Sequence, residues 1–224
     1  MKIGVSLAGV SYHDGSSYRK RDYKDALDGF FTNVINPLKE EGHEVLFYLF
    51  TYNTDKKEDI LKAYNPIKST FIVDESNYNN LTSGDRLPNG IRMMTLTTVN
   101  ALNELIDEDL DMVISTRFDI SFDKNPFKEY KYDFSKCNFL WREPEFTEIP
   151  IVCDTFIVFP HSMTENLIQS YIEMETNPSH GVQPGNHNIY IPMCNQVGYE
   201  NVKILCDDFK ASHNNDLYKL TRTE

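Results

Sequence analysis

Apolar residues in the first half of the chain follow two alternating patterns. Short, nearly continuous apolar runs are typical of strands that are buried on both faces of a sheet. Between them, apolar residues recur every three or four positions, as they do on one face of a helix. The runs that predict strands are 2–10, 45–50, 69–74 and 111–116. The stretches that predict helices are 21–41, 59–64 and 91–106. This alternation favours an α/β fold, with a mostly parallel sheet and helices packed on its faces.

The second half of the chain is less regular. Strands are predicted at 138–141, 155–159 and 202–206, and helices at 162–175 and 188–197. The long polar segment 75–90 has no periodicity, and a loop of this length in a compact domain often binds or covers a ligand. A second loop is predicted at 177–187. The stretch from residue 207 onward is polar and predicts no element. No linker or repeat divides the sequence, so we expect residues 1–224 to form a single domain.

Charge and cysteine usage narrow the range of partners and compartments. The chain has 34 acidic and 22 basic residues and a net charge of −12, which disfavours binding to nucleic acid or to an anionic membrane surface. The cysteines have no metal-type spacing, which indicates reduced core thiols and a reducing compartment. No apolar run is long enough to span a bilayer. We therefore expect a soluble, cytoplasmic protein without a membrane span.

The segment after the first strand is a candidate ligand loop, because ligands of open α/β sheets bind at the carboxyl ends of the strands. The run ends in Ala8 and Gly9, where a ligand could approach the backbone closely. Tyr12 could stack on a base, and the basic residues that follow, Arg19 above all, could meet phosphate. Neither a G-x-G-x-x-G fingerprint nor a P-loop is present. The alternative is a solvated loop in which Gly9 only turns the chain.

The most informative segment is the buried run at 111–116, which leads directly into Arg117 and Asp119. Side chains two residues apart on an extended chain point the same way, so we expect both to face one site. A buried charge needs a partner. A diphosphate would satisfy Arg117, and a divalent cation would satisfy Asp119. The alternative is a structural ion pair between the two residues.

At this segment the chain resembles the glycosyltransferases of GT-A type, which usually carry an Asp-x-Asp motif at this point. Here the motif reads Ser115-Thr116-Arg117-Phe118-Asp119, with Asp119 as its only carboxylate. This variant is similar to a segment of small glycosyltransferases of large algal DNA viruses and of bacterial capsule and lipopolysaccharide glycosyltransferases. A viral origin would place the protein in the host cytoplasm.

The resemblance implies a GT-A-like, Rossmann-type sheet with a nucleotide-sugar-binding half, 1–122, and an acceptor-side half, 123–224. It further implies transfer from a nucleotide-diphosphate sugar, with a UDP-sugar favoured, to a hydroxyl of a glycan acceptor. The cofactor would be Mn²⁺ or Mg²⁺, held by Asp119.

The resemblance also assigns roles to residues outside the motif. Arg92 would reach the diphosphate, Asp74 the base or ribose, and His213 the metal. Asp154, in the segment Cys153-Asp154-Thr155-Phe156, would be the base that accepts the acceptor's proton, which implies inversion. The alternative for Asp154 is a carboxylate that caps a strand at the surface.

Two other functions remain open, a nucleotidyltransferase and a non-catalytic sugar- or nucleotide-binding module. The glutamates of the Pro-rich segment, Glu143, Glu145 and Glu148, are interpreted as a solvated face. His187 has no partner at the spacing of a zinc site.

Overall fold

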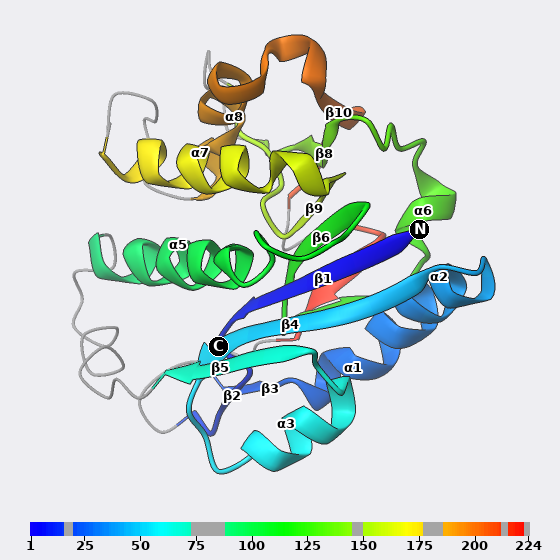
Figure 1. Cartoon of the computed structure of the whole chain (residues 1–224), viewed down its shortest axis with the longest axis vertical. Coiled ribbons are helices and arrows are strands. Elements are labelled where there is room, and N and C mark those ends of the chain that lie inside the picture. Colours follow the sequence, from blue (N-terminus) through cyan, green and yellow to red (C-terminus); the bar gives the residue numbers. More distant parts are fainter. Residues whose placement is uncertain (16–19, 73–87, 145–149, 177–185, 212–214, 222–224) are drawn as a thin grey trace.

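The computed structural model describes residues 1–15, 20–72, 88–144, 150–176, 186–211 and 215–221, and it shows helices on both faces of a central sheet (Figure 1). Seven strands form this sheet in the order β10-β8-β9-β6-β1-β4-β5. Neighbouring strands are parallel, except that β9 is antiparallel to β6 and to β8. The strands are β1 (Lys2–Gly9), β4 (Glu44–Tyr52), β5 (Lys68–Ile72), β6 (Met112–Arg117), β8 (Cys137–Arg142), β9 (Phe156–Pro160) and β10 (Val202–Phe209). These are the seven strands that the sequence predicts, with ends displaced by a few residues.

The helices form two layers (Figure 1). The first layer comprises α1 (Lys24–Phe30), the π-helical segment Phe31–Ile35, α2 (Asn36–Glu40) and α3 (Lys57–Tyr64). The opposite layer comprises α5 (Pro88–Asn103), α7 (Thr164–Thr176) and α8 (Tyr190–Val197). Shorter elements are α6 (Pro126–Glu129) and the 3₁₀ turns His161–Met163, Asn186–Ile189 and Tyr199–Asn201. Each layer packs its own hydrophobic cluster against the sheet.

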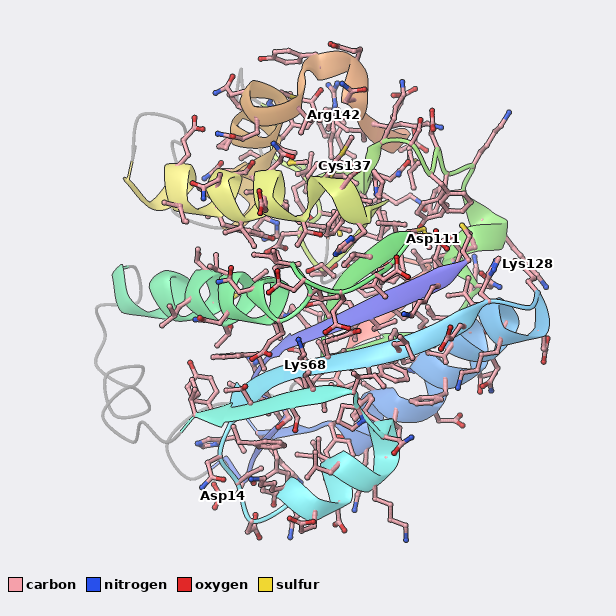
Figure 2. All side chains as sticks on the ribbon, in the orientation of Figure 1. Asp14, Lys68, Asp111, Lys128, Cys137 and Arg142 are labelled. Atoms are coloured by element: carbon pink, nitrogen blue, oxygen red, sulfur yellow. The ribbon has the colours of Figure 1, made fainter. Side chains whose placement is uncertain are left out.

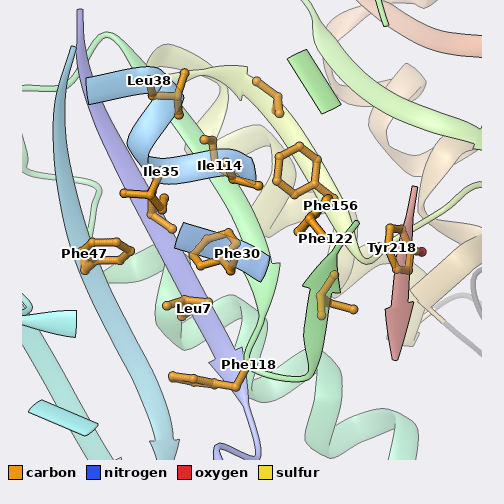
Figure 3. Close-up of a cluster of buried hydrophobic side chains, with 14 of the residues drawn as sticks. Leu7, Phe30, Ile35, Leu38, Phe47, Ile114, Phe118, Phe122, Phe156 and Tyr218 are labelled. Carbon is orange, nitrogen blue, oxygen red and sulfur yellow. The ribbon is translucent and has the colours of Figure 1, made fainter. Parts of the chain in front are cut away.

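Figure 3 shows the cluster beneath α1 and α2. Phe30, Ile35 and Leu38 point from the helical layer toward the sheet, where they join Leu7 of β1 and Ile114 of β6. All five side chains are buried, and burial of a side chain of this size contributes about 1.5–3 kcal/mol. The three-and-four spacing that predicts the helix is therefore the spacing of the residues that reach the core.

The predicted helix 21–41 differs from the structure at its start and in its middle. The helix begins at Lys24, because Arg21–Asp22 forms β3, which pairs with β2 (Tyr12–His13). Its middle is the π-helical turn Phe31–Ile35, just before Pro37. Proline donates no backbone hydrogen bond and its ring crowds the preceding turn, so a wider π turn relieves both problems.

The polar C-terminal stretch contains a strand that the hydrophobic pattern does not predict. Strand β11 (Tyr218–Leu220) runs antiparallel to β7 (Ile120–Phe122), which follows β6 directly. Leu217 and Tyr218 are both about 1% exposed, so this stretch belongs to the core. The chain thereby returns to the end of β6, next to Arg117 and Asp119.

The topology identifies one edge of the sheet as a ligand edge. Strand β1 lies between β4 and β6, so the chain leaves β1 on one side and later returns on the other. Ligands of open α/β sheets bind at such a switch point, outside the carboxyl ends of the strands. Figure 2 labels Asp14 beyond this edge and Asp111 at the opposite edge, where Lys2 N donates to Asp111 Oδ2 over 2.7 Å.

No helix among the described residues combines the length and the apolar character needed to cross a bilayer.

Candidate active site

The end of β1 supplies the backbone of the site. Ala8 is buried and lies opposite Arg117 in the parallel ladder between β1 and β6. Gly9 has a φ of +98°, a conformation that side chains other than glycine rarely adopt. A Cβ built at Gly9 would meet nothing within 4 Å, so the conformation, rather than close packing, requires glycine here.

The chain after Gly9 is tied down by polar contacts at the same edge. Ser11 N donates to Thr51 Oγ1 over 3.2 Å, and Thr51 Oγ1 donates to Ser11 Oγ over 2.9 Å. Tyr12 follows in β2, where Lys56 Nζ lies 5.6 Å from the centroid of its ring. One face of the Tyr12 ring therefore meets a cation in this structure.

Arg117 and Asp119 lie on the same side of the chain, as the sequence predicts, and they form an ion pair with each other. Arg117 Nε donates to Asp119 Oδ1 over 2.9 Å, and Arg117 Nη2 donates to Asp119 Oδ2 over 2.6 Å. Arg21, from β3, brings Nη1 to 3.7 Å from Asp119 Oδ2. Asp119 is 3% exposed, so two guanidinium groups meet one carboxylate inside the protein. We call Arg21, Arg117 and Asp119 the arginine cluster.

The pair leaves Asp119 with both oxygens engaged. Burial alone would lower the pKa of Arg117, but the Asp119 carboxylate outweighs burial and raises that pKa. The described residues contain no group of three or more His, Cys, Asp or Glu side chains suited to a metal ion. The described residues around Asp119 therefore do not by themselves form a metal site. The arrangement observed is the structural ion pair between Arg117 and Asp119.

A second group of charges lies at the start of β9 and the end of β8. Asp154 is almost fully buried, with 2% of its side chain exposed, and its Oδ1 lies 3.2 Å from His187 Nδ1. Glu143 Oε1 lies 4.0 Å from the same nitrogen. His187 Nδ1 donates its hydrogen to Val152 O over 3.1 Å, and Asp154 Oδ1 receives no hydrogen bond. We call Glu143, Asp154 and His187 the histidine cluster.

The two clusters are neighbours. Thr116, at the end of β6, donates from Oγ1 to Thr155 O over 2.9 Å, which ties the motif strand to the residue after Asp154. Asp154 contributes to raising the pKa of Arg117. Burial lowers the pKa of His187, but Asp154, Glu143 and the bond to Val152 O outweigh it and the pKa is raised, while Arg117 opposes them.

Strand β11 contacts the two residues that flank Asp154 of the histidine cluster. Tyr218 OH lies 2.6 Å from Thr155 Oγ1 and 3.4 Å from Cys153 Sγ, and its ring stacks on Trp141. Burial raises the pKa of Cys153 to about 11, so this thiol is a packing residue rather than a nucleophile. Asp154 thus stands between two residues, Cys153 and Thr155, that are both bonded to Tyr218.

The structure brings together part of the predicted site. Ala8, Arg117, Asp119 and Asp154 lie at the carboxyl edge of the sheet. Arg19, Asp74 and His213 fall outside the described residues. Arg92 lies in α5, where its side chain is likewise outside what the structure describes.

The histidine cluster contains two residues that the sequence does not single out. The interpretation of Glu143 as a solvated residue is wrong, since Glu143 is 7% exposed. The position of Glu143, one residue after β8, could have indicated that its side chain is buried at the end of the sheet. His187 lies 33 positions after Asp154 in the numbering, and no spacing rule connects the two. Only the fold, through the 3₁₀ turn Asn186–Ile189, brings His187 to Asp154.

Comparison with known proteins bears on the fold. No family model matches the chain, and no curated protein sequence does. Among solved structures, an active-site mutant of LgtC aligns with 91% of this chain and 72% of its own, at 14% sequence identity and a TM-score of 0.50. A crystal structure of the galactosyltransferase LgtC with donor and acceptor sugar analogues covers 91% and 73% at 14% identity, with a TM-score of 0.49, which is too low to add weight. The first alignment shows the fold alone, and it confirms the predicted GT-A-like α/β class.

Proposed function

We propose that this protein is a glycosyltransferase, which moves a sugar from a nucleotide-diphosphate sugar to a hydroxyl of a glycan. The observation that carries the proposal is the pair of adjacent clusters at the carboxyl edge of a GT-A-like sheet. One cluster holds two guanidinium groups and the other pairs buried carboxylates with an imidazole. Sugar transfer needs both, a site for the leaving diphosphate and a group that removes the acceptor's proton.

The arginine cluster is the proposed diphosphate site. Arg21 and Arg117 bring two guanidinium groups to the carboxyl edge of the sheet, where both meet the Asp119 carboxylate. Guanidinium groups bind phosphate oxygens, and here they would stabilise the negative charge that grows on the leaving diphosphate. Ala8 and Gly9 border this position, and Tyr12 is the proposed stacking face for the base. Arg19, Asp74 and Arg92 remain predicted donor contacts, and a UDP-sugar is the favoured donor.

The histidine cluster is the proposed acceptor side. A hydroxyl that attacks the sugar carbon must lose its proton, and Asp154 with His187 forms a pair of basic groups next to a residue that bonds the motif strand. Inversion remains the predicted outcome, because a hydroxyl activated by these groups would attack the sugar carbon directly and displace the diphosphate. The acceptor-side half of the chain contributes all three residues of this cluster.

A divalent cation remains a separate prediction. Asp119 would have to exchange Arg117 for Mn²⁺ or Mg²⁺, with His213 as the predicted further ligand, and no step above depends on it. A carboxylate that leaves a buried arginine without a partner loses two charge-assisted hydrogen bonds. The chemistry that a bound ion would supply is neutralisation of the diphosphate.

Thermal unfolding with nucleotide sugars tests the donor. UDP-glucose, UDP-galactose, GDP-mannose and dTDP-glucose are each added with and without Mn²⁺, and saturation at about 100 times Kd stabilises the folded protein by roughly 2.7 kcal/mol. We expect one nucleotide to raise Tm and Arg117→Gln to abolish the rise. A rise that needs Mn²⁺ supports the metal. No rise with any donor contradicts the proposal.

One observation favours a second candidate, a non-catalytic nucleotide- or sugar-binding module. Asp119 is bound to Arg117 in a manner that a purely structural motif would also show. This candidate predicts the same rise in Tm. It differs in turnover, because a binding module would release no nucleoside diphosphate from the bound donor.

A further inference from the structure

His187 and Asp154, the two candidate bases of the histidine cluster, differ in solvent exposure. Asp154 has 2% of its side chain exposed, whereas His187 has 40% exposed. A general base has to come within hydrogen-bond distance of the proton it removes. His187 meets this condition with its ring in place, and the Asp154 carboxylate does not.

The hydrogen bond to Val152 sets the tautomer of His187. A carbonyl oxygen only accepts, so the contact between Nδ1 and Val152 O places the ring hydrogen on Nδ1. In the neutral ring, Nε2 then carries the free lone pair. Within the described residues, Nε2 has no hydrogen-bond or ion-pair partner, so this lone pair is open to a ligand.

The charges around His187 suit a ring that gains a proton. Asp154 precedes β9 and Glu143 follows β8, and both carboxylates lie within 4.0 Å of Nδ1. Arg117, on β6, is the positive charge that acts on the ring. Because the two carboxylates outweigh burial and Arg117, they raise the pKa of His187, which favours a base that works near neutral pH.

We propose that His187 Nε2, rather than the Asp154 carboxylate, takes the proton from the acceptor hydroxyl, while Asp154 and Glu143 hold the ring and stabilise its charged form. This inference rests on the proposed function and assigns its base to a residue that the sequence resemblance does not include. Asp154 and Glu143 are positioning residues in this scheme.

Removal of the acceptor's proton accompanies transfer of the sugar. The acceptor O–H bond breaks and its proton goes to Nε2, while the acceptor oxygen forms a bond to the sugar carbon. The bond between that carbon and the diphosphate oxygen breaks, and the nucleoside diphosphate leaves with the electron pair. The imidazolium later returns its proton to water.

Nitrogen NMR of the histidine ring tests the arrangement without any substrate. The protein has six histidines, and His187→Gln identifies the signal of His187. We expect the tautomer with hydrogen on Nδ1, and a lower pKa in Asp154→Asn and in Glu143→Gln than in the wild type. Hydrogen on Nε2, or a pKa that neither substitution changes, would overturn the inference.

Release of nucleoside diphosphate tests the chemistry, with water as the acceptor and UDP-galactose, UDP-glucose and GDP-mannose as probes. We expect His187→Gln to lower the rate by roughly 100-fold and to remove the loss of activity at acid pH. Asp154→Asn should keep that acid limb but move it to lower pH, because His187 loses the charge that raises its pKa. His161→Gln is the matched control, since the glutamine can still donate to Leu105 O, which His161 Nε2 contacts at 2.8 Å.

Failure of the proposed function and failure of the role of His187 give different results in these experiments. If the wild type binds none of the probes in calorimetry, the proposed function fails and the role of His187 fails with it. If a probe is bound and turned over, and His187→Gln keeps the acid limb that Asp154→Asn removes, Asp154 is the base and only this inference fails.

Discussion

The arginine cluster and the histidine cluster lie side by side but satisfy their charges differently. In the arginine cluster, both oxygens of Asp119 receive hydrogen bonds from Arg117. In the histidine cluster, Asp154 Oδ1 is close to a ring nitrogen that donates its hydrogen to Val152 O instead. The first arrangement is a hydrogen-bonded ion pair. The second is a buried carboxylate with an unmade hydrogen bond, an arrangement that stability alone does not require.

The largest effect is expected from opening the arginine cluster. Arg117→Met leaves Asp119 buried without its main partner, which we expect to cost about 3 kcal/mol in the free energy of unfolding. Urea unfolding at neutral pH measures it. Lys24→Met, which removes an exposed pair with Asp59 at 3.6 Å, is the control and should cost well under about 1 kcal/mol. Equal costs for the two variants would show that the Arg117 pair is no more than a surface contact.

Loss of the support beneath the histidine cluster comes next. Tyr218→Phe removes the hydroxyl that bonds Thr155, and we expect a loss of about 1–2 kcal/mol, because Thr155 is buried and keeps only the weaker contact with Cys153 Sγ at 3.0 Å. Tyr199→Phe is the control, since Tyr199 is 59% exposed. Chemical denaturation of both variants makes the comparison. A neutral Tyr218→Phe would mean that β11 does not stabilise the position of Asp154.

A smaller effect is expected at the backbone beside the arginine cluster. Gly9→Ala forces a side chain into a left-handed conformation, at a cost of about 1 kcal/mol, while its Cβ meets no atom. Gly42→Ala is closely matched, with a φ of +84° and equally open surroundings, but it lies far from the site along the chain. Both should lose similar stability in thermal melts. Only Gly9→Ala should also weaken donor binding, and equal binding in the two would argue against a donor beside Gly9.

The smallest effect is the pH dependence of stability contributed by His187. Its pKa is raised by folding, so its stabilising contribution is complete below the unfolded pKa of about 6.5 and disappears as pH rises through the folded pKa. The difference in stability between the wild type and His187→Gln should therefore be larger at pH 5.5 than at pH 8.5. Denaturant melts at the two pH values measure it. A difference that grows with pH would show that burial, rather than the two carboxylates, dominates the ring.

The sequence predicts the scaffold well because local patterns decide it. All seven strands of the sheet, and the alternation of strands and helices in the first half, follow from apolar runs and helical spacing, whereas the order of the strands in the sheet does not. The same locality explains why Arg117 and Asp119 could be predicted to lie together, since they are two residues apart at the end of a buried strand. Asp154 was proposed through a resemblance rather than through its surroundings.

The rest of the site depends on contacts that are distant along the chain. His187 reaches Asp154 only through the antiparallel placement of β9 and the turn before α8, and Glu143 is buried by the same packing. Strand β11 is three residues long and alternates weakly, so its partner β7 rather than its sequence pattern makes it a strand. A charged residue in a polar, irregular segment, such as Glu143, is therefore interpreted as solvated from the sequence alone, and only the fold shows that it is buried.

The pairing of β11 with β7 also has a consequence for the order in which this protein folds. Tyr218 lies opposite Phe122, and contacts between such distant parts of a chain form slowly, because the loop between them must first close. Strand β4 pairs with β1 and β5, which are nearer to it along the chain. In pulse-labelling hydrogen exchange during refolding, amides of β4 should gain protection before those of β11, so the strand that contacts Cys153 and Thr155 would form after this part of the sheet.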